Sequence, residues 1–265
     1  MEIEWSIVIP TYKEKDNLKE LVTRVVRALA EEKKQSSTEI IIVDDNSQDG
    51  SVQVIESLQK EGYNVRIDVR TKERGLSSAV MHGFRQAKGV CLLCMDADLQ
   101  HPPEKVPELL NAIDPKFSSQ PAEFVIGTRY AGENSIDKDW PVYRRVLSGG
   151  ARVLARPLTP LSDPMTGFFG LRKDVLGRAT NVNTLGFKIS LELYVKCNVT
   201  KHAEVPIIFG VRQYGYSKLS SKVIVHYLQH LRHLYWNTHP FLFVVLIALA
   251  LFGVLGVLYF LFSLL

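Results

Sequence analysis

The sequence has little net charge and no long basic run. Its 265 residues include 32 Lys and Arg against 28 Asp and Glu, which gives a formal net charge of +4. Proteins that bind nucleic acid usually concentrate basic residues in a patch or stripe, so we expect no nucleic-acid partner. The 46% hydrophobic content is enough for one good-sized core with accessory segments.

Cysteine is scarce, and the glycines form no known phosphate loop. There is no Walker loop and no G-x-G-x-x-G, which disfavours an ATPase or a dehydrogenase. Cys91 and Cys94 have C-x-x-C spacing, but both lie in a predicted strand, where residues three apart point to opposite faces. We therefore predict buried core thiols in a reducing compartment. The charged opening residues run directly into a strand, so no signal peptide is expected.

The C-terminal segment lacks charge altogether. The stretch from Phe241 to Leu265 contains no charged residue and is almost wholly apolar. About 20 apolar residues suffice to cross a bilayer core. A buried core helix is the weaker alternative, because the segment has no amphipathic face. We predict a single transmembrane helix over residues 240–265.

Short apolar runs alternate with amphipathic stripes in the rest of the chain. This pattern predicts an α/β fold with a mostly parallel sheet and flanking helices. Strands are expected at 5–10, 39–44, 65–70, 90–95, 124–127 and 205–211, and a turn into a strand is expected at 163–170. Helices are expected at 17–32, 51–60, 76–87, 103–113 and 189–196, and in a basic stretch from Trp140. We predict a catalytic domain over 1–218 and an amphipathic juxtamembrane helix over 219–239.

The juxtamembrane helix carries several histidines. His226, His230 and His233 have spacing that suits metal ligands, but no carboxylate or cysteine accompanies them in the sequence. We therefore expect a solvated or interfacial face. The helix either lies in the membrane interface or packs on the domain, and the pattern favours neither.

Two carboxylates, Asp96 and Asp98, follow the predicted strand 90–95. The carboxyl ends of parallel strands share one edge of a sheet, where open α/β folds bind ligands. Carboxylate oxygens at this place suit Mg²⁺ or Mn²⁺ holding a phosphate group, although the pair alone is also compatible with an ordinary acidic turn. Other candidate groups follow other strands and can converge there: Tyr12, Glu14, Asp44, Asp45, Arg129 and Arg212.

Seven motifs together resemble the dolichol-phosphate mannosyltransferase family. They are IVIPTYKE (7–14), VDDNSQDG (43–50), MDADLQHPPE (95–104), GTRY (127–130), DPMTGFFG (163–170), GFKI (186–189) and GYSKL (215–219). The family is of the inverting family-2 type with a Rossmann-like GT-A fold. The likeness is greatest to its single-chain form, which has its own C-terminal anchor. Asn46 departs from the pattern, since many members have Gly there, but Asn tolerates the left-handed backbone.

The resemblance implies transfer of mannose from GDP-mannose to dolichyl phosphate with inversion. The product would be the β-linked lipid mannose donor for protein glycosylation and GPI-anchor synthesis. It also implies an endoplasmic reticulum membrane location, a single span, a cytosolic catalytic domain and no obligatory anchoring subunit.

The resemblance also implies roles for individual residues. Asp96, Asp98 and Gln100 would hold the Mg²⁺ or Mn²⁺ ion. Arg129, Arg144 and Ser148 would meet the acceptor phosphate, and Asp98, Arg129 and Arg212 would serve catalysis. The donor site would comprise Pro10, Tyr12, Glu14, Val43, Asp45, Asp96, Ala97, Asp98, Gln100, Lys188, Arg212 and Lys218.

Two alternative functions remain open at this stage. A lipid-phosphate glucosyltransferase using UDP-glucose would share the fold and metal site, and a non-catalytic scaffold would bind sugar nucleotides without turnover. For the transferase, we expect no carboxylate general base, because a phosphate monoester has a second pKa of about 6 and is mostly a dianion at neutral pH.

Overall fold

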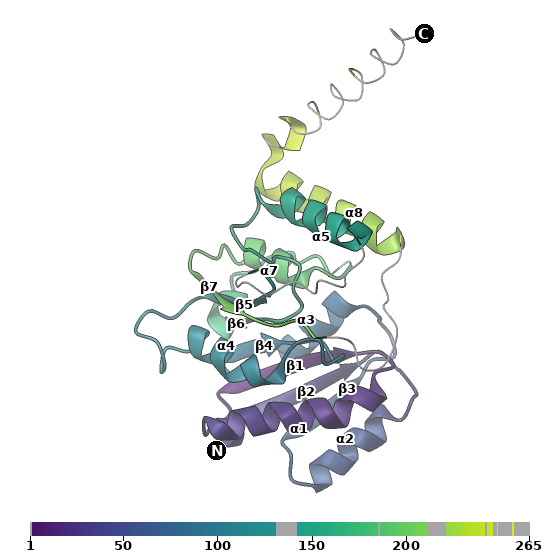
Figure 1. The fold of residues 1–265 in the computed structure, drawn as a ribbon, viewed down its shortest axis with the longest axis vertical. Coiled ribbons are helices and arrows are strands. Elements are labelled where there is room, and N and C mark those ends of the chain that lie inside the picture. Colours follow the sequence, from purple (N-terminus) through teal and green to yellow (C-terminus); the bar gives the residue numbers. More distant parts are fainter. Residues whose placement is uncertain are drawn as a thin grey trace.

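A seven-stranded sheet forms the centre of the computed structural model (Figure 1). The structure describes residues 2–130, 142–184, 186–210, 221–241, 243–245, 248 and 256, with backbone alone for 142–147 and 221–223. The strand order is β3-β2-β1-β4-β6-β5-β7. The strands are β1 Trp5–Thr11, β2 Thr38–Asp44, β3 Val65–Val69, β4 Cys91–Cys94, β5 Phe124–Thr128, β6 Phe169–Arg172 and β7 His202–Pro206. β6 is antiparallel to β4 and β5, and the other pairs are parallel.

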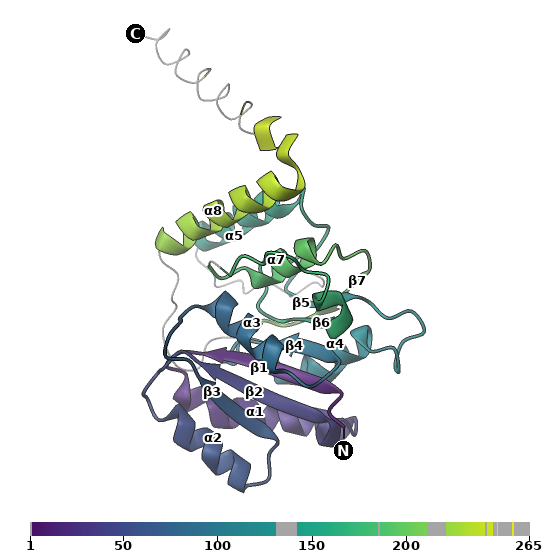
Figure 2. The same ribbon diagram turned by 180° about the vertical axis from the view of Figure 1, so that it is seen from behind.

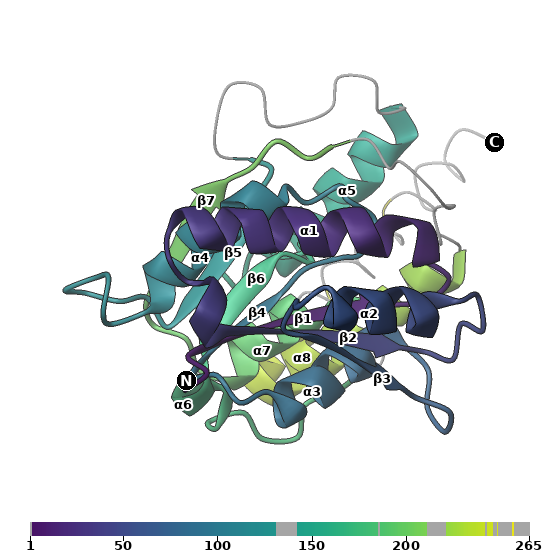
Figure 3. The same cartoon turned by 90° about the horizontal axis from the view of Figure 1, so that it is seen from below.

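Helices cover both faces of this sheet, as Figure 3 shows. They are α1 Lys15–Glu31, α2 Ser51–Lys60, α3 Leu76–Gln86, α4 Val106–Ile113, α5 Val142–Ala155, α6 Lys173–Leu176, α7 Ile189–Lys196 and α8 Ser221–Thr238, with short 3₁₀ turns η1 Gln35–Ser37 and η2 Pro103–Lys105. Because side chains alternate along a strand, Ile7 and Ile9 face α1, α2 and α4, whereas Val8 faces α3. The α/β prediction is confirmed, with a mixed, mostly parallel sheet.

The predicted burial of both thiols is confirmed by the structure. Cys91 packs in the cluster under α1 and α4, and Cys94 packs in the cluster on the opposite face. Both thiols are buried and free. Burial raises the pKa of Cys91 to about 12, so this thiol is poorly suited to redox exchange.

Helices α5 and α8 lie side by side over α7 (Figures 1 and 2). A third apolar cluster joins them, and the Tyr227 and Tyr235 hydroxyls on α8 donate to the carbonyls of Ala151 and Leu154 at 2.7 Å each. Helix α8 therefore packs on the domain. The expectation for His230 was wrong: it is buried, and its Nε2 lies 2.7 Å from Oε2 of Glu192 on α7.

The last strand begins and ends earlier than the sequence predicts. The strand predicted at 205–211 is instead β7, because its register follows β5 from Phe124 opposite His202 to Thr128 opposite Pro206. Within the described residues, no helix combines the length and hydropathy needed to cross a membrane. Most of the predicted span at 240–265 lies outside those residues.

The packing of α3 against the sheet predicts a steric limit at Gly83. A Cβ there would collide with Val8 Cγ1 and lie 3.1 Å from Val43 Cγ2. We expect Gly83→Ala to lower the free energy of unfolding by about 1–3 kcal/mol, measured by chemical denaturation. Gly149→Ala is the control, because no described atom lies within 4 Å of its added Cβ. Equal stability of the two variants would contradict this packing.

Candidate functional site

The loops after β1, β2 and β4 meet at one edge of the sheet and form a pocket of about 380 Å³. We call it the edge pocket. It brings together the predicted residues Pro10, Tyr12, Glu14, Asp45, Asp96, Ala97 and Asp98. Thr11, Arg74, Gly75, Leu76, Ala79 and Phe187 complete its lining and were not predicted. Arg74 follows β3, so the rule that singled out the other strand ends also points to it.

The Asp45 carboxylate holds the loop that follows β3. Its Oδ1 accepts hydrogen bonds from Arg70, with Nε at 2.8 Å, and its Oδ2 accepts from the Gly75 amide at 2.7 Å. Arg70 is itself buried and also donates to the Ser78 hydroxyl at 3.0 Å. Asp45 thus lines the pocket and also positions Arg74, whose guanidinium lies 5.6 Å from the Tyr12 ring centre.

The Asp96–Asp98 turn is held by local contacts. The Gln100 amide donates to Asp98 Oδ1 at 3.1 Å, and the Asp96 amide donates to His101 Nδ1 at 3.3 Å. Burial lowers the pKa of His101 to about 4, so the ring is neutral and Nδ1 can accept this bond. Leu99 has a φ of 61°, an uncommon left-handed conformation that turns the chain between Asp98 and Gln100.

Gly167 leaves space for the Asp96 carboxylate. A Cβ at this position would lie 2.7 Å from both Oδ1 and Oδ2 of Asp96, so any other side chain would displace that carboxylate. The carboxylates of Asp96 and Asp98 are hard oxygen donors from one turn. Among the described residues, no group of three or more His, Cys, Asp or Glu side chains has an arrangement that could hold a metal ion.

Three described donor-site predictions, Val43, Gln100 and Lys188, lie outside the pocket lining. Val43 is fully buried in the core beside Gly83, so its side chain is not available to a ligand. The Gln100 side chain donates to the Gly210 carbonyl at 3.0 Å, and the Gly210 amide returns a bond to the Gln100 carbonyl at 2.8 Å. Gln100 therefore ties the segment after β7 to the Asp96–Asp98 turn.

A second cluster of charged side chains, around Arg129, lies near the edge pocket. Arg129, at the end of β5, forms an ion pair with the buried Asp163, with Nε at 2.7 Å from Oδ2. Burial and the neighbouring Arg129 lower the pKa of Lys188 to about 8, while Asp163 and Asp96 oppose that shift. Lys188 Nζ donates to the Met165 carbonyl at 3.4 Å, which places it beside the loop that carries Asp163.

The remaining predicted residues are only partly described. Ser148 lies on α5, and its hydroxyl is 3.0 Å from the hydroxyl of Tyr130, the neighbour of Arg129. Arg144 lies on the same helix, but its side chain is outside the described part of the structure. Arg212 and Lys218 also lie outside the described residues.

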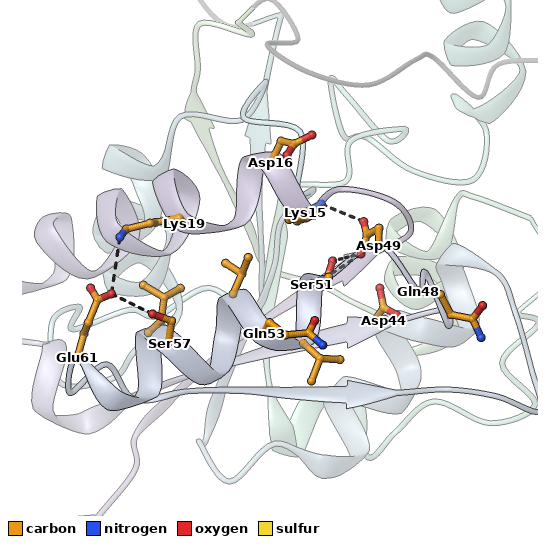
Figure 4. Close-up of a pocket in the computed structure, with 14 residues that line it drawn as sticks. Lys15, Asp16, Lys19, Asp44, Gln48, Asp49, Ser51, Gln53, Ser57 and Glu61 are labelled. Atoms are coloured by element: carbon orange, nitrogen blue, oxygen red, sulfur yellow. Dashed lines mark hydrogen bonds and ion pairs between the residues drawn. The ribbon is translucent and has the colours of Figure 1, made fainter.

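A larger hollow of about 770 Å³ lies between α1 and α2 (Figure 4). Its polar groups bind one another: the Lys15 amide donates to Asp49 at 3.2 Å, the Ser51 hydroxyl donates to Asp49 at 2.6 Å, and Lys19 pairs with Glu61 at 3.6 Å. Of the candidate groups at the strand ends it contains Asp44, but it contains none of the predicted donor, metal or acceptor residues. The edge pocket is therefore the better candidate site despite its smaller volume.

Comparison with known proteins identifies similar chains. The family model described as Glycosyl transferase family 2 matches residues 6–179. A dolichol-phosphate mannosyltransferase of Mycosarcoma maydis is 54% identical over 93% of this chain and 85% of its own length. The corresponding enzyme of Saccharomyces cerevisiae is 54% identical over 89% of this chain and 88% of its own length.

A solved structure shares the fold at lower identity. It is the mannosyltransferase of Pyrobaculum calidifontis in complex with GDP-Man and Mn²⁺, with a TM-score of 0.59 and 17% identity. The alignment covers 89% of this chain and 64% of that chain. At this identity the likeness concerns the fold alone.

The Asp45–Arg70 pair predicts a local instability when it is broken. Asp45→Asn leaves the buried Arg70 cation with only the exposed Glu73, 3.8 Å away, as a counter-charge, so we expect a loss of about 3 kcal/mol in the free energy of unfolding. The Gly75 amide should also exchange hydrogen faster. Asp68→Asn is the matched control, because the Arg66–Asp68 pair has a similar 2.8 Å separation but is more exposed. A loss no larger than that of the control would refute the assigned role.

Proposed function

Because the chain belongs to glycosyl transferase family 2, and within it to the dolichol-phosphate mannosyltransferases, we propose that it transfers mannose from GDP-mannose to dolichyl phosphate with inversion. It has the α/β GT-A fold of this group. The edge pocket supports this proposal, because Tyr12, Asp45, Asp96 and Asp98 come together there.

The chemistry of the pocket suits a guanosine diphosphate sugar. At one end, Asp45 and Glu14 offer carboxylate oxygens, which can accept hydrogen bonds from a base or a ribose. Arg74 and Tyr12 supply a cation and a ring face beside them. At the other end lie Asp96 and Asp98, with Lys188 near enough to Asp96 to be influenced by its charge. We assign the nucleoside to the first end and the diphosphate to the second.

A divalent cation fits the second end. Asp96 and Asp98 would hold Mg²⁺ or Mn²⁺ together with diphosphate oxygens, which are ligands of the kind these ions prefer. When bound, the ion would neutralise negative charge on the departing diphosphate. Gly167 leaves the Asp96 carboxylate the space that it occupies, because a Cβ there would lie 2.7 Å from both of its oxygens. Gln100 acts instead through its bonds to Gly210.

The acceptor phosphate belongs beside Arg129. We assign it to Arg129, Ser148 and Arg144, with Arg212 and Lys218 completing the donor site. A phosphate dianion needs no deprotonation before it attacks the anomeric carbon. The nearby Asp163 carboxylate is already engaged by Arg129, which supports a mechanism without a carboxylate base. The protein's task is then to place the two reactants in line.

Membrane association follows from the same function, because the acceptor is a lipid. We propose a catalytic domain over 1–218, a juxtamembrane helix over 219–239 and a single endoplasmic reticulum membrane span over 240–265, with the domain in the cytosol and no obligatory anchoring subunit. Exposed apolar side chains on α5 and α8 support membrane docking: Val153, Leu154, Val225, Leu228 and Trp236.

The choice of sugar nucleotide tests the proposed function. Purified chain should form a glycolipid from GDP-mannose, a polyprenyl phosphate and Mn²⁺, and should form none from UDP-glucose. Radiolabelled sugar extracted into organic solvent provides the readout. Asp98→Ala should abolish the product, whereas Asp16→Asn removes an exposed carboxylate outside the edge pocket and should not. Transfer from UDP-glucose would identify the glucosyl enzyme, and nucleotide binding without transfer would identify a scaffold.

The close approach of Gly167 to Asp96 gives a prediction for metal binding. Gly167→Ala displaces the Asp96 carboxylate, so we expect binding of GDP with Mn²⁺ to weaken by about tenfold or more, since one charge-assisted contact contributes about 1.5–3 kcal/mol. Calorimetry measures this directly. Gly177→Ala is the control, because its added Cβ meets no described atom closer than 3.4 Å. Unchanged affinity in the Gly167 variant would remove Asp96 from the metal site.

We expect residues 241–265 to retain the chain at the membrane and to make no contribution to catalysis. Deleting 241–265 should leave a folded chain that transfers mannose in detergent but is released from membranes by high salt. Protease added to sealed microsomes should cut the catalytic domain of the full chain. Complete protection of the domain would reverse the proposed topology.

A further inference from the structure

We propose that Asp163 is a positioning residue for the acceptor phosphate, because its carboxylate fixes the plane of the Arg129 guanidinium. This inference rests on the proposed function, since it takes Arg129 as the group that meets the phosphate. It assigns to Asp163 a role in transfer that neither its sequence position nor its motif predicted.

The contact between the two side chains is bidentate. Arg129 Nε donates to Asp163 Oδ2 at 2.7 Å, and Nη2 donates to Oδ1 at 2.9 Å. The Arg129 backbone amide also approaches Oδ2 at 3.3 Å. Two parallel hydrogen bonds fix both the direction and the rotation of the guanidinium plane, which a single bond would not. The edge of the guanidinium that carries Nε and Nη2 therefore faces Asp163, and this fixes the direction in which Nη1 points.

The loop that carries Asp163 is anchored independently of its carboxylate. The Thr166 amide donates to the Asp163 carbonyl at 3.3 Å, and the Thr166 hydroxyl donates to the Gly127 carbonyl at 3.0 Å. Ser162 Oγ lies 2.6 Å from Thr128 Oγ1, and the Ser162 amide donates to Glu204 at 2.7 Å. Loss of the Asp163 charge should therefore free Arg129 while the loop stays in place.

Aromatic rings restrict the guanidinium further. Its carbon lies 5.1 Å from the Phe209 ring centre and 5.8 Å from that of Tyr130. Tyr130 connects this group to α5, because its hydroxyl meets Ser148 and its ring lies 4.2 Å from the Arg152 guanidinium. The Arg129 guanidinium is thus held by Asp163 and by these rings. It lies beside α5, the helix to which we assign the acceptor phosphate.

The negative charge of Asp163 distinguishes a positioning role from a role in attracting the phosphate. Asp163 is negative, so it weakens the attraction of a phosphate to this region and cannot be there to raise affinity. Its removal should therefore have little effect on the KM for the lipid phosphate and a large effect on kcat. A displacement of a reacting group by about 1 Å can lower a rate by about 10²-fold.

The test is a double-mutant cycle on the full chain, with GDP-mannose and dolichyl phosphate as substrates. We expect Asp163→Asn to lower kcat by about tenfold or more and to leave the KM values for dolichyl phosphate and GDP-mannose within about twofold of wild type. Arg129→Ala should lower kcat at least as far. The double variant should match Arg129→Ala alone, because the carboxylate acts only through the guanidinium.

A separate role for Asp163 would give a different pattern. One such pattern is a loss of kcat in the double variant that equals the product of the two single losses. Another is a shift in the pH profile with Asp163→Asn that persists in the Arg129→Ala background. Either result would mean that Asp163 acts by itself, for instance as a general base, and would overturn the proposal. An unchanged kcat in Asp163→Asn would also overturn it. If Arg129→Ala left acceptor kinetics unchanged, the acceptor assignment in the proposed function would fail instead.

Two further variants keep the test decisive. Asp174→Asn is the control, because Asp174 makes a similar bidentate contact with Arg172, at 3.0 and 3.2 Å, but is exposed; its kcat should equal that of wild type. Arg129→Lys keeps the charge without the planar fork, so it should also lose about tenfold in kcat even if Asp163→Asn does not fold. A wild-type rate in Arg129→Lys would overturn the proposal.

Discussion

Backbone hydrogen bonds just beyond the strand ends hold the reactive edge of this molecule together. The Asp45 amide donates to the Thr11 carbonyl at 3.0 Å, the Met95 amide to the Val8 carbonyl at 3.2 Å, and the Arg70 amide to the Asp44 carbonyl at 2.7 Å. Each bond continues a parallel ladder into a loop, so the loops leave the sheet in the same order as the strands. The carboxylates of Asp45, Asp96 and Asp98 line one pocket for this reason.

Buried charges around this edge are paired across elements that are distant in the sequence. Asp45 pairs with Arg70, and Arg129 pairs with Asp163. Removing one partner of such a pair costs more than the pair contributes, because the other is left buried and uncompensated. These pairs therefore fix loop geometry more than they add stability. The same restraint that orients Arg129 would also keep the acceptor phosphate and the sugar in line.

Local elements could be predicted from the sequence, whereas their partners could not. Periodicity predicted α2 at Ser51–Lys60 and α7 at Ile189–Lys196, because helix boundaries depend on neighbouring residues. The antiparallel direction of β6 and the start of β7 depend on β4 and β5, which lie far away in the sequence. Burial of His230 and the pairing of Asp163 likewise depend on residues 38 and 34 positions away. The motif residues of the edge pocket were predictable; the groups that hold them were not.

The most direct test of this account is the structure of the chain with GDP and Mn²⁺ bound. We expect the nucleotide in the edge pocket, with the ion against Asp96 and Asp98 and the guanosine beside Asp45 and Arg74. Nucleotide bound in the hollow between α1 and α2, with the edge pocket unchanged, would contradict it.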